Sequence, residues 1–128
     1  MTEPILSLKD VHTHIHQHHI LQGVSLKVKP GRATVLVGRN GAGKSTTLRT
    51  IMALTPATSG AIEMEGQAIQ NRKPYEIAHL GIGYVPEDNA VLYTLTVEEN
   101  LRLAMFQESD QGWSRLETIF RLFPDLKR

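Results

Sequence analysis

Residues 38–45 form a glycine-rich stretch that decides the fold: Gly38, Arg39, Asn40, Gly41, Ala42, Gly43, Lys44 and Ser45. It fits the pattern G-x-x-x-x-G-K-[ST], in which glycines let the backbone wrap closely around a phosphate chain. Successive amides up to Thr46 can then donate to phosphate oxygens, and Lys44 adds a positive charge. The Ser45 hydroxyl is expected to bind Mg²⁺. The stretch therefore predicts a loop that binds the phosphates of a nucleoside triphosphate with Mg²⁺.

The segments on both sides of this loop support the prediction. Residues 33–37 are a continuous β-branched and aliphatic run, which predicts a strand buried on both faces. Residues 45–54 have the spacing of a helix, with Leu48 and Ile51 on one side. The alternative is that residues 38–45 are a glycine-rich turn formed by chance between a strand and a helix. This alternative is disfavoured, because Lys44 and Ser45 would also have to stand at the start of the helix by accident.

The rest of the chain predicts a mixture of short strands and helices. Alternation of apolar and polar residues at 5–11 and 24–28 predicts an antiparallel pair of strands joined through a histidine-rich stretch. Further short strands are expected at 61–66 and 82–85, and a helix at 74–80. Thr96 and Glu99 form a capping box before a helix expected to bury Val97, Leu101, Ala104 and Met105. A last amphipathic helix is expected to carry one stripe of Trp113, Leu116, Phe120 and Phe123.

The amino-acid composition excludes several classes of protein and of site. The 128 residues suit one domain, and 14 basic against 13 acidic residues leave a net charge of +1, which offers no basic field for nucleic acid. Cysteine is absent, so disulfides, thiolate metal sites and a cysteine nucleophile are excluded. No signal peptide and no apolar run of membrane-spanning length are visible.

Five parts of the sequence resemble segments of one known family. They are residues 23–31, 38–47, 59–66, 81–87 and 95–101. Together they look like the nucleotide-binding subunit of an ABC transporter, and most of all like the ATPases of branched-chain amino acid importers. The loop alone is common to many NTPases, whereas its combination with Val-Pro-Glu at 85–87 and Leu-Thr-Val-Glu-Glu-Asn-Leu at 95–101 is much more specific.

This resemblance implies an α/β fold, a P-loop NTPase core with an antiparallel β subdomain and the start of a helical subdomain. Residues 1–128 would be a partial nucleotide-binding domain, with about 1–86 as the core and about 87–128 as the Q-loop and the start of the helical subdomain. The family's signature and Walker B segments have no match, since no Ser-Gly-Gly occurs and no aspartate follows four apolar residues. We therefore expect roughly the first half of a cassette, with no catalytic residue in this chain.

Two further site residues are carried over from the family at positions where this sequence departs from it. Ile15 occupies the place of an aromatic residue that stacks on adenine, so adenine is expected to lie on Ile15 or on a neighbouring imidazole. Glu87 stands where the family usually has the glutamine of its Q-loop, a change familiar in the branched-chain amino acid branch. Glu87 is expected to approach Mg²⁺, and the alternative is a solvated loop residue.

The function implied by the resemblance is that of an ATP-binding subunit, which couples ATP binding and hydrolysis to the import of branched-chain amino acids. Its partners would be a second ATP-binding subunit and transmembrane permease subunits contacted through Glu87–Leu101, at the cytoplasmic side of a bacterial membrane. Two alternatives stay open: a truncated fragment that binds nucleotide without hydrolysis, and a soluble ABC ATPase not tied to transport.

A histidine-rich stretch lies between the first two expected strands. His12, His14, His16 and His18 recur at every second residue, and His19 follows. On an extended strand the first four would share one face, and imidazoles two apart can chelate Zn²⁺ or Ni²⁺. A solvated strand face near a hairpin turn is the favoured interpretation, because no carboxylate cluster stands nearby to support a metal.

Overall fold

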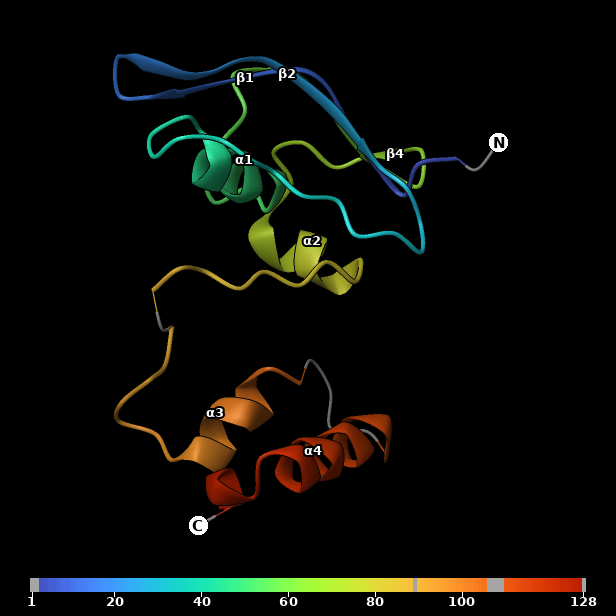
Figure 1. Ribbon diagram of the computed structural model, residues 1–128, viewed down its shortest axis with the longest axis vertical. Coiled ribbons are helices and arrows are strands. Elements are labelled where there is room, and N and C mark those ends of the chain that lie inside the picture. The colour runs from blue at the N-terminus through green and yellow to red at the C-terminus, as the bar shows by residue number, and fades with distance from the viewer. Residues whose placement is uncertain (1–2, 89, 106–109, 128) are drawn as a thin grey trace. The chain divides into compact units, whose positions relative to one another are not determined.

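The chain forms two compact units, Met1–Tyr84 and Val85–Arg128. The computed structural model in Figure 1 describes residues 3–88, 90–105 and 110–127. Asn89, which falls within the region expected to contact permease subunits, lies outside the described residues.

The first unit is built on a four-stranded antiparallel sheet with strand order β2-β1-β3-β4. Its strands are β1 (Leu6–Ile15), β2 (His18–Val28), β3 (Ser59–Met64) and β4 (Gln67–Ala68). Strands β1 and β2 form the hairpin drawn in blue in Figure 1, so the expected antiparallel pair is confirmed. The pairing extends through the histidine-rich stretch almost to the turn, and its last pair joins Ile15 to His18.

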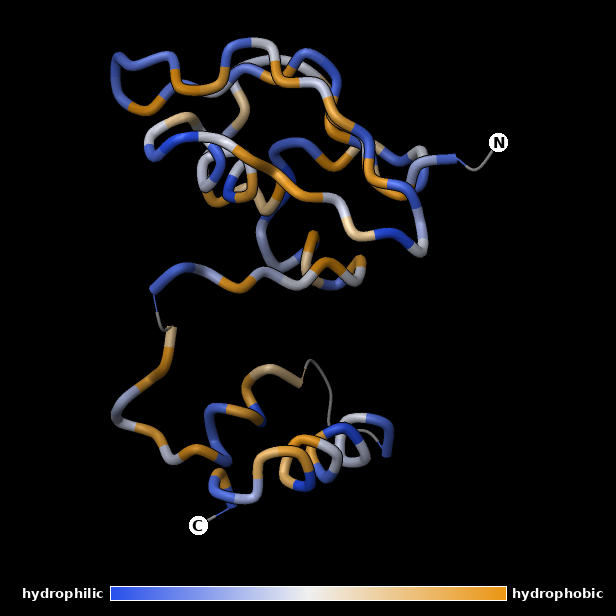
Figure 2. The backbone as a smooth tube through the Cα atoms, viewed as in Figure 1, coloured by the Kyte–Doolittle hydropathy of each residue, from blue (hydrophilic) through white to orange (hydrophobic). Residues whose placement is uncertain are grey.

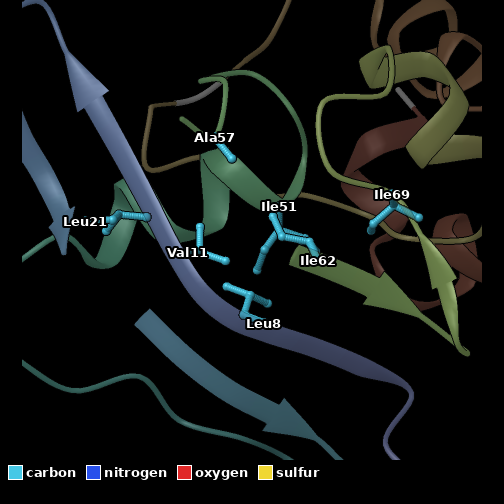
Figure 3. Close-up of a cluster of buried hydrophobic side chains, with 7 residues drawn as sticks. All are labelled: Leu8, Val11, Leu21, Ile51, Ala57, Ile62 and Ile69. Atoms are coloured by element: carbon cyan, nitrogen blue, oxygen red, sulfur yellow. The ribbon is translucent and has the colours of Figure 1, made fainter. Parts of the chain in front are cut away.

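Helix α1 (Lys44–Ile51) packs beneath this sheet and closes the hydrophobic core. Figure 3 shows the cluster, in which Leu8, Val11, Ile51 and Ile62 lie together with Leu21 and Ile69 toward its two sides. Burial of each such aliphatic side chain stabilises the fold by roughly 1.5–3 kcal/mol. A buried hydrogen bond of 3.1 Å between the Thr13 and Thr50 hydroxyls also joins β1 to α1.

The segment between α1 and β3 is fastened by one asparagine. Asn71 accepts a hydrogen bond from the Ala57 amide at 2.8 Å and donates one to the Ala57 carbonyl at 2.9 Å. Helix α2 (Pro74–His79) follows shortly after, in the place expected for the helix at 74–80, and buries Ile77. Short polar contacts of this kind fix the loop that returns the chain from α1 to the sheet.

Two strands expected from the sequence are not formed. Residues 33–37 have no ladder partner among the described residues, and the side chains of Val35 and Val37 are 78% and 87% exposed. Figure 2 shows the hydrophobic colour that runs along this segment. Residues 82–85 likewise join no sheet formed by the described part of the chain, and Val85 is exposed. An apolar run becomes a strand only when another strand satisfies its backbone groups, so composition alone gave the wrong prediction here.

The second unit contains α3 (Val97–Leu103), α4 (Asp110–Leu122) and the 3₁₀ helix η1 (Pro124–Lys127). The predicted capping box is confirmed: the Glu99 amide donates to the Thr96 hydroxyl at 3.1 Å, and the Thr96 amide donates to the Glu99 carboxylate at 2.8 Å. Within this unit, Asn100 holds the preceding turn through hydrogen bonds of 2.9 and 3.0 Å to the Leu92 backbone. None of the described helices is long and apolar enough to cross a membrane.

The burial expected of the two helices in this unit is only partly present. Helix α3 has no fully buried residue, although four had been expected to be buried, and Val97 at its start is 43% exposed. On α4 the expected stripe buries Leu116, whereas Phe123 lies beyond the helix and is exposed. The capping box satisfies backbone groups at the start of α3 even though the helix buries no residue.

Candidate phosphate-binding site

The loop at 38–45 has the backbone conformation that its glycines were expected to allow. Gly41 and Gly43 have φ angles of +83° and +101°, in the left-handed region that residues with a Cβ rarely adopt. The Ala42 amide donates to the Arg39 carbonyl at 3.1 Å and closes a tight turn between them. The loop therefore turns back on itself immediately before α1.

Lys44 is the first residue of α1, and its side chain folds back across the loop. The Lys44 ammonium donates to the Gly38 carbonyl and, at 3.1 Å, to the Arg39 carbonyl. These contacts place a positive charge inside the concave side of the loop. A compact ammonium on a flexible stem can exchange such carbonyl contacts for phosphate oxygens.

The N-terminus of α1 is open to an anion. Gly43 caps the helix without a side-chain hydrogen bond, and no acidic residue occurs in the first turn. The first bond of the helix runs from the Thr47 amide to the Gly43 carbonyl at 2.8 Å. The amides of Lys44, Ser45 and Thr46 therefore have no intrahelical acceptor, and together with the helix dipole they attract negative charge. This is the donor set that phosphate groups use at helix N-termini.

The loop is seated against strand β2 through Gly43. A Cβ built at Gly43 would lie 3.0 Å from Leu21 Cδ2 and 3.6 Å from the Ile20 carbonyl oxygen. The Thr47 hydroxyl also donates to the Gly43 carbonyl at 2.7 Å, in a buried position. A pocket of about 390 Å³ opens beside this contact, lined by β2, the loop and α1. The sequence pattern did not reveal the contacts made by Leu21 and Thr47, because neither residue belongs to the motif.

Residues 21–126 match the sequence pattern of a protein family described as ABC transporter. The match covers most of the chain, including the whole loop and α1. The chain belongs to the ABC transporter family. The matched region includes residues 38–45, whose lysine and helix N-terminus have the geometry just described.

Curated members of the family show how much of such a protein this ABC transporter chain spans. It is 38% identical over 124 residues to the high-affinity branched-chain amino acid transport ATP-binding protein BraG of Pseudomonas aeruginosa, covering 96% of this chain and 53% of that protein. It is 36% identical over 110 residues to the probable branched-chain amino acid transport ATP-binding protein LivF of Archaeoglobus fulgidus, covering 85% and 47%. The ribose import ATP-binding protein RbsA of Oceanobacillus iheyensis is 30% identical over 108 residues, covering 84% and 22%. The chain therefore spans about half the length of the first two relatives.

Solved structures of ABC transporter proteins share the fold. An ATP-binding subunit of an ABC transporter superposes with a TM-score of 0.80 at 32% identity, covering 97% of this chain and 52% of that one. A nucleotide-free ATP-binding cassette gives a TM-score of 0.73, also at 32% identity, covering 85% and 44%. The expected α/β architecture, a partial P-loop core beside an antiparallel sheet, is confirmed.

The remaining predicted site residues of this ABC transporter chain lie in different parts of the structure. Ser45 is exposed on the first turn of α1. Ile15 is the last residue of β1 and is 37% exposed. It pairs with His18 of β2. His18 lies two residues before Ile20, which adjoins Gly43. At about 3.3 Å per strand residue, the end of β1 lies within roughly 10 Å of that contact. Glu87 is exposed and belongs to the second unit.

Proposed function

We propose that this chain is the ATP-binding part of an ABC importer that couples ATP binding and hydrolysis to solute uptake. The observation that carries the proposal is the Lys44 ammonium inside a left-handed glycine loop, directly before the open amides of α1. A cation, free amides and the positive end of a helix dipole at one loop are the features that binding of a triphosphate requires.

The residues present fit Mg-ATP. An anion site needs hydrogen-bond donors and no nearby carboxylate to repel the phosphates, and the first turn of α1 has no acidic residue. Gly38, Arg39, Asn40, Gly41, Ala42 and Gly43 supply the backbone of the loop, Thr46 supplies an amide in the first turn of α1, and Lys44 supplies the charge. The exposed Ser45 hydroxyl is proposed as a Mg²⁺ ligand, and the resemblance makes Glu87 a second candidate. Mg²⁺ would neutralise phosphate charge. Ile15 is proposed to adjoin the adenine, where an aliphatic side chain offers weaker stacking than an aromatic ring.

Branched-chain amino acids are the solute that we propose. The two relatives named for branched-chain amino acid transport are 38% and 36% identical to this chain, and two relatives named for ribose import are 30% and 35% identical. Because these identities differ little, the choice of solute depends on the names of the first two relatives together with the resemblance around Glu87.

The assembly that we propose has two ATP-binding subunits on permease subunits at the cytoplasmic side of a bacterial membrane. The permease contact would involve Glu87–Leu101, which contains the ordered turn held by Asn100. In domain terms, about 1–86 would form the core, and about 87–128 would carry the Q-loop and the start of the helical subdomain.

Titration with a fluorescent ATP analogue and Mg²⁺ tests the nucleotide site. Lys44→Ala removes a charge-assisted contact of roughly 1.5–3 kcal/mol, so it should weaken binding by about tenfold to a hundredfold. Lys29→Ala is the matched control, because Lys29 is an exposed lysine outside the loop, and it should bind as tightly as the unchanged chain. Equal affinities for Lys44→Ala and Lys29→Ala would contradict the assignment.

A further inference from the structure

Three histidines meet on the outer face of the β1–β2 hairpin. His12 and His14 lie on β1, and His19 lies opposite them on β2, paired in register with His14. Thr13 and Leu21 point to the other face, where both are buried. We call His12, His14 and His19 the histidine cluster. His16 is not part of it, because it lies in the hairpin turn with a φ of +57°.

The rings of the cluster are joined by a continuous set of contacts. His12 Nε2 lies 3.2 Å from the Asp10 carboxylate, and His12 Nδ1 lies 2.9 Å from His19 Nε2. The His14 ring stacks on His19 with 4.2 Å between centroids and 9° between planes. His14 Nδ1 also reaches the Thr58 hydroxyl at 2.9 Å, which ties the hairpin to the segment before β3.

The contact between His12 and His19 depends on how many protons the two rings hold. Two ring nitrogens 2.9 Å apart form a hydrogen bond only when one donates and the other accepts. If both rings are fully protonated, two N–H groups and two positive charges face each other, and the contact is lost. The cluster therefore holds together when it is neutral or singly protonated and separates when it is further protonated.

The geometry does not suit a metal ion. Rings that stack in parallel direct their in-plane lone pairs along separate planes, so His14 and His19 do not converge on one point. Among the described residues no group of three or more potential ligands is arranged to hold a metal. Proton binding is thus the chemistry that this arrangement supports.

The position of Asp10 is fixed by the backbone around it. Asp10 lies at an irregularity of β1 with a φ of +47°, and its amide donates to the Ser25 hydroxyl at 2.9 Å. A Cβ at Gly23 would lie 2.7 Å from the Asp10 carboxylate, so the side chain uses space that only glycine leaves open. The fold thus holds a carboxylate beside His12. The pair by itself contributes little stability, because Asp10 is 81% exposed.

We propose that the histidine cluster is a pH-sensitive latch that keeps the tip of the β1–β2 hairpin closed at neutral pH and releases it in mildly acidic solution. Desolvation lowers the pKa of His19 below its usual value of 6.5, and the charges of His14 and His12 lower it further, while a hydrogen bond to the Leu21 backbone acts in the opposite direction. The groups that face His19 are His12 and His14 on β1, whereas Asp10 and Thr58 reach the cluster through His12 and His14, respectively.

The direction of the effect follows from this lowered pKa. The unfolded or opened hairpin binds a proton on His19 more readily than the closed one does, so acid favours opening. The contribution of His19 is complete above about pH 6.5 and is lost as the pH falls toward the lower value of the closed state. Because Ile15 ends β1 at this tip, opening should also weaken ATP binding, a consequence that rests on the proposed function.

Amide hydrogen exchange of the 128-residue chain at pH 7.5 and 5.5 tests the latch, compared at each pH with His19→Phe. Phenylalanine keeps a ring to stack on His14 but has no nitrogen to protonate. In the unchanged chain the protection of residues 14–19, relative to His19→Phe, should fall by roughly threefold to tenfold on acidification, the factor expected for one lost hydrogen bond. Residues 6–8 at the base of the hairpin should keep their protection.

His16→Asn is the matched control. Asparagine tolerates a left-handed turn position and leaves the cluster intact, so this variant should respond to pH like the unchanged chain. An equal response in His19→Phe and the unchanged chain, or none in either, would overturn the latch. Fluorescent-ATP titrations at both pH values separate the two proposals: loss of protection without loss of affinity would support the latch and contradict the placement of Ile15 beside adenine.

Discussion

Gly43 is the residue at which the loop, helix α1 and strand β2 meet. It has a φ of +101°, caps α1, and leaves 3.0 Å between its missing Cβ and Leu21 Cδ2. Gly41 shares the left-handed conformation, with a φ of +83°, but nothing lies within 4 Å of its missing Cβ. The two glycines therefore separate the effect of backbone conformation from the effect of close packing.

Alanine at each position should destabilise the chain by different amounts. Gly41→Ala adds mainly the cost of a left-handed alanine, about 1–2 kcal/mol in free energy of unfolding. Gly43→Ala adds the displacement of Leu21 from the core to that cost, so we expect about 2–4 kcal/mol. Urea unfolding monitored by circular dichroism gives both values. Equal losses in the two variants would show that the Leu21 contact is unimportant.

Single residues were predictable from the sequence where their requirement is local. The left-handed glycines and the lysine at the start of a helix follow from one motif. The histidines show the limit of this reasoning: His12 and His14 do share a face, but the alternation stops at His16 because the chain turns there. His19, the partner of both, comes from the other strand, and register across a hairpin is not written in one strand's spacing.

Among the helices and strands, capping was easier to predict than pairing. The capping box at Thr96 involves groups three residues apart, so its pattern appears directly in the sequence. The segment 33–37 has the composition of a buried strand, yet among the described residues it has no partner, and two of its valines are largely exposed. A strand depends on a second segment that is distant in sequence, which explains why this prediction was wrong.

An unpaired segment with exposed apolar side chains, such as 33–37, promotes association of chains. The 128-residue chain should therefore bind a hydrophobic dye and aggregate readily. Changing Val35 and Val37 together to threonine keeps the shape of each side chain while adding a polar group. We expect lower dye fluorescence and slower aggregation, with an unchanged circular dichroism spectrum. The same double change at Val91 and Val97, which are less exposed, is the control and should have a smaller effect. A monomeric, dye-negative starting chain would contradict this view of 33–37.

For the molecule as a whole, the resemblance carried the prediction further than local patterns did. The α/β architecture and the family were identified from segments spread between 23 and 101, and the structural relatives confirm them. Local patterns could not relate Ser45 to Glu87, because contacts between segments distant in sequence are not encoded in the spacing of either segment. The local features that the structure does confirm, the left-handed glycines and the lysine that begins α1, lie within one loop and the helix after it.

We expect the 128-residue chain by itself to bind ATP without hydrolysing it at a useful rate. Phosphoryl transfer to water needs both neutralisation of charge on the γ-phosphate and an oriented water molecule. The loop, Lys44 and Mg²⁺ on Ser45 can provide the first. The second needs a positioned carboxylate, and Glu87, the one candidate that the resemblance supplies, is assigned by it to the metal and the permease contact. Without a positioned base, turnover typically falls by about 10²–10⁴-fold.

Phosphate release by the purified chain measures this turnover, with Lys44→Ala as the control for contaminating ATPases. Steady release near one turnover per second, abolished by Lys44→Ala, would show that these residues are sufficient for catalysis.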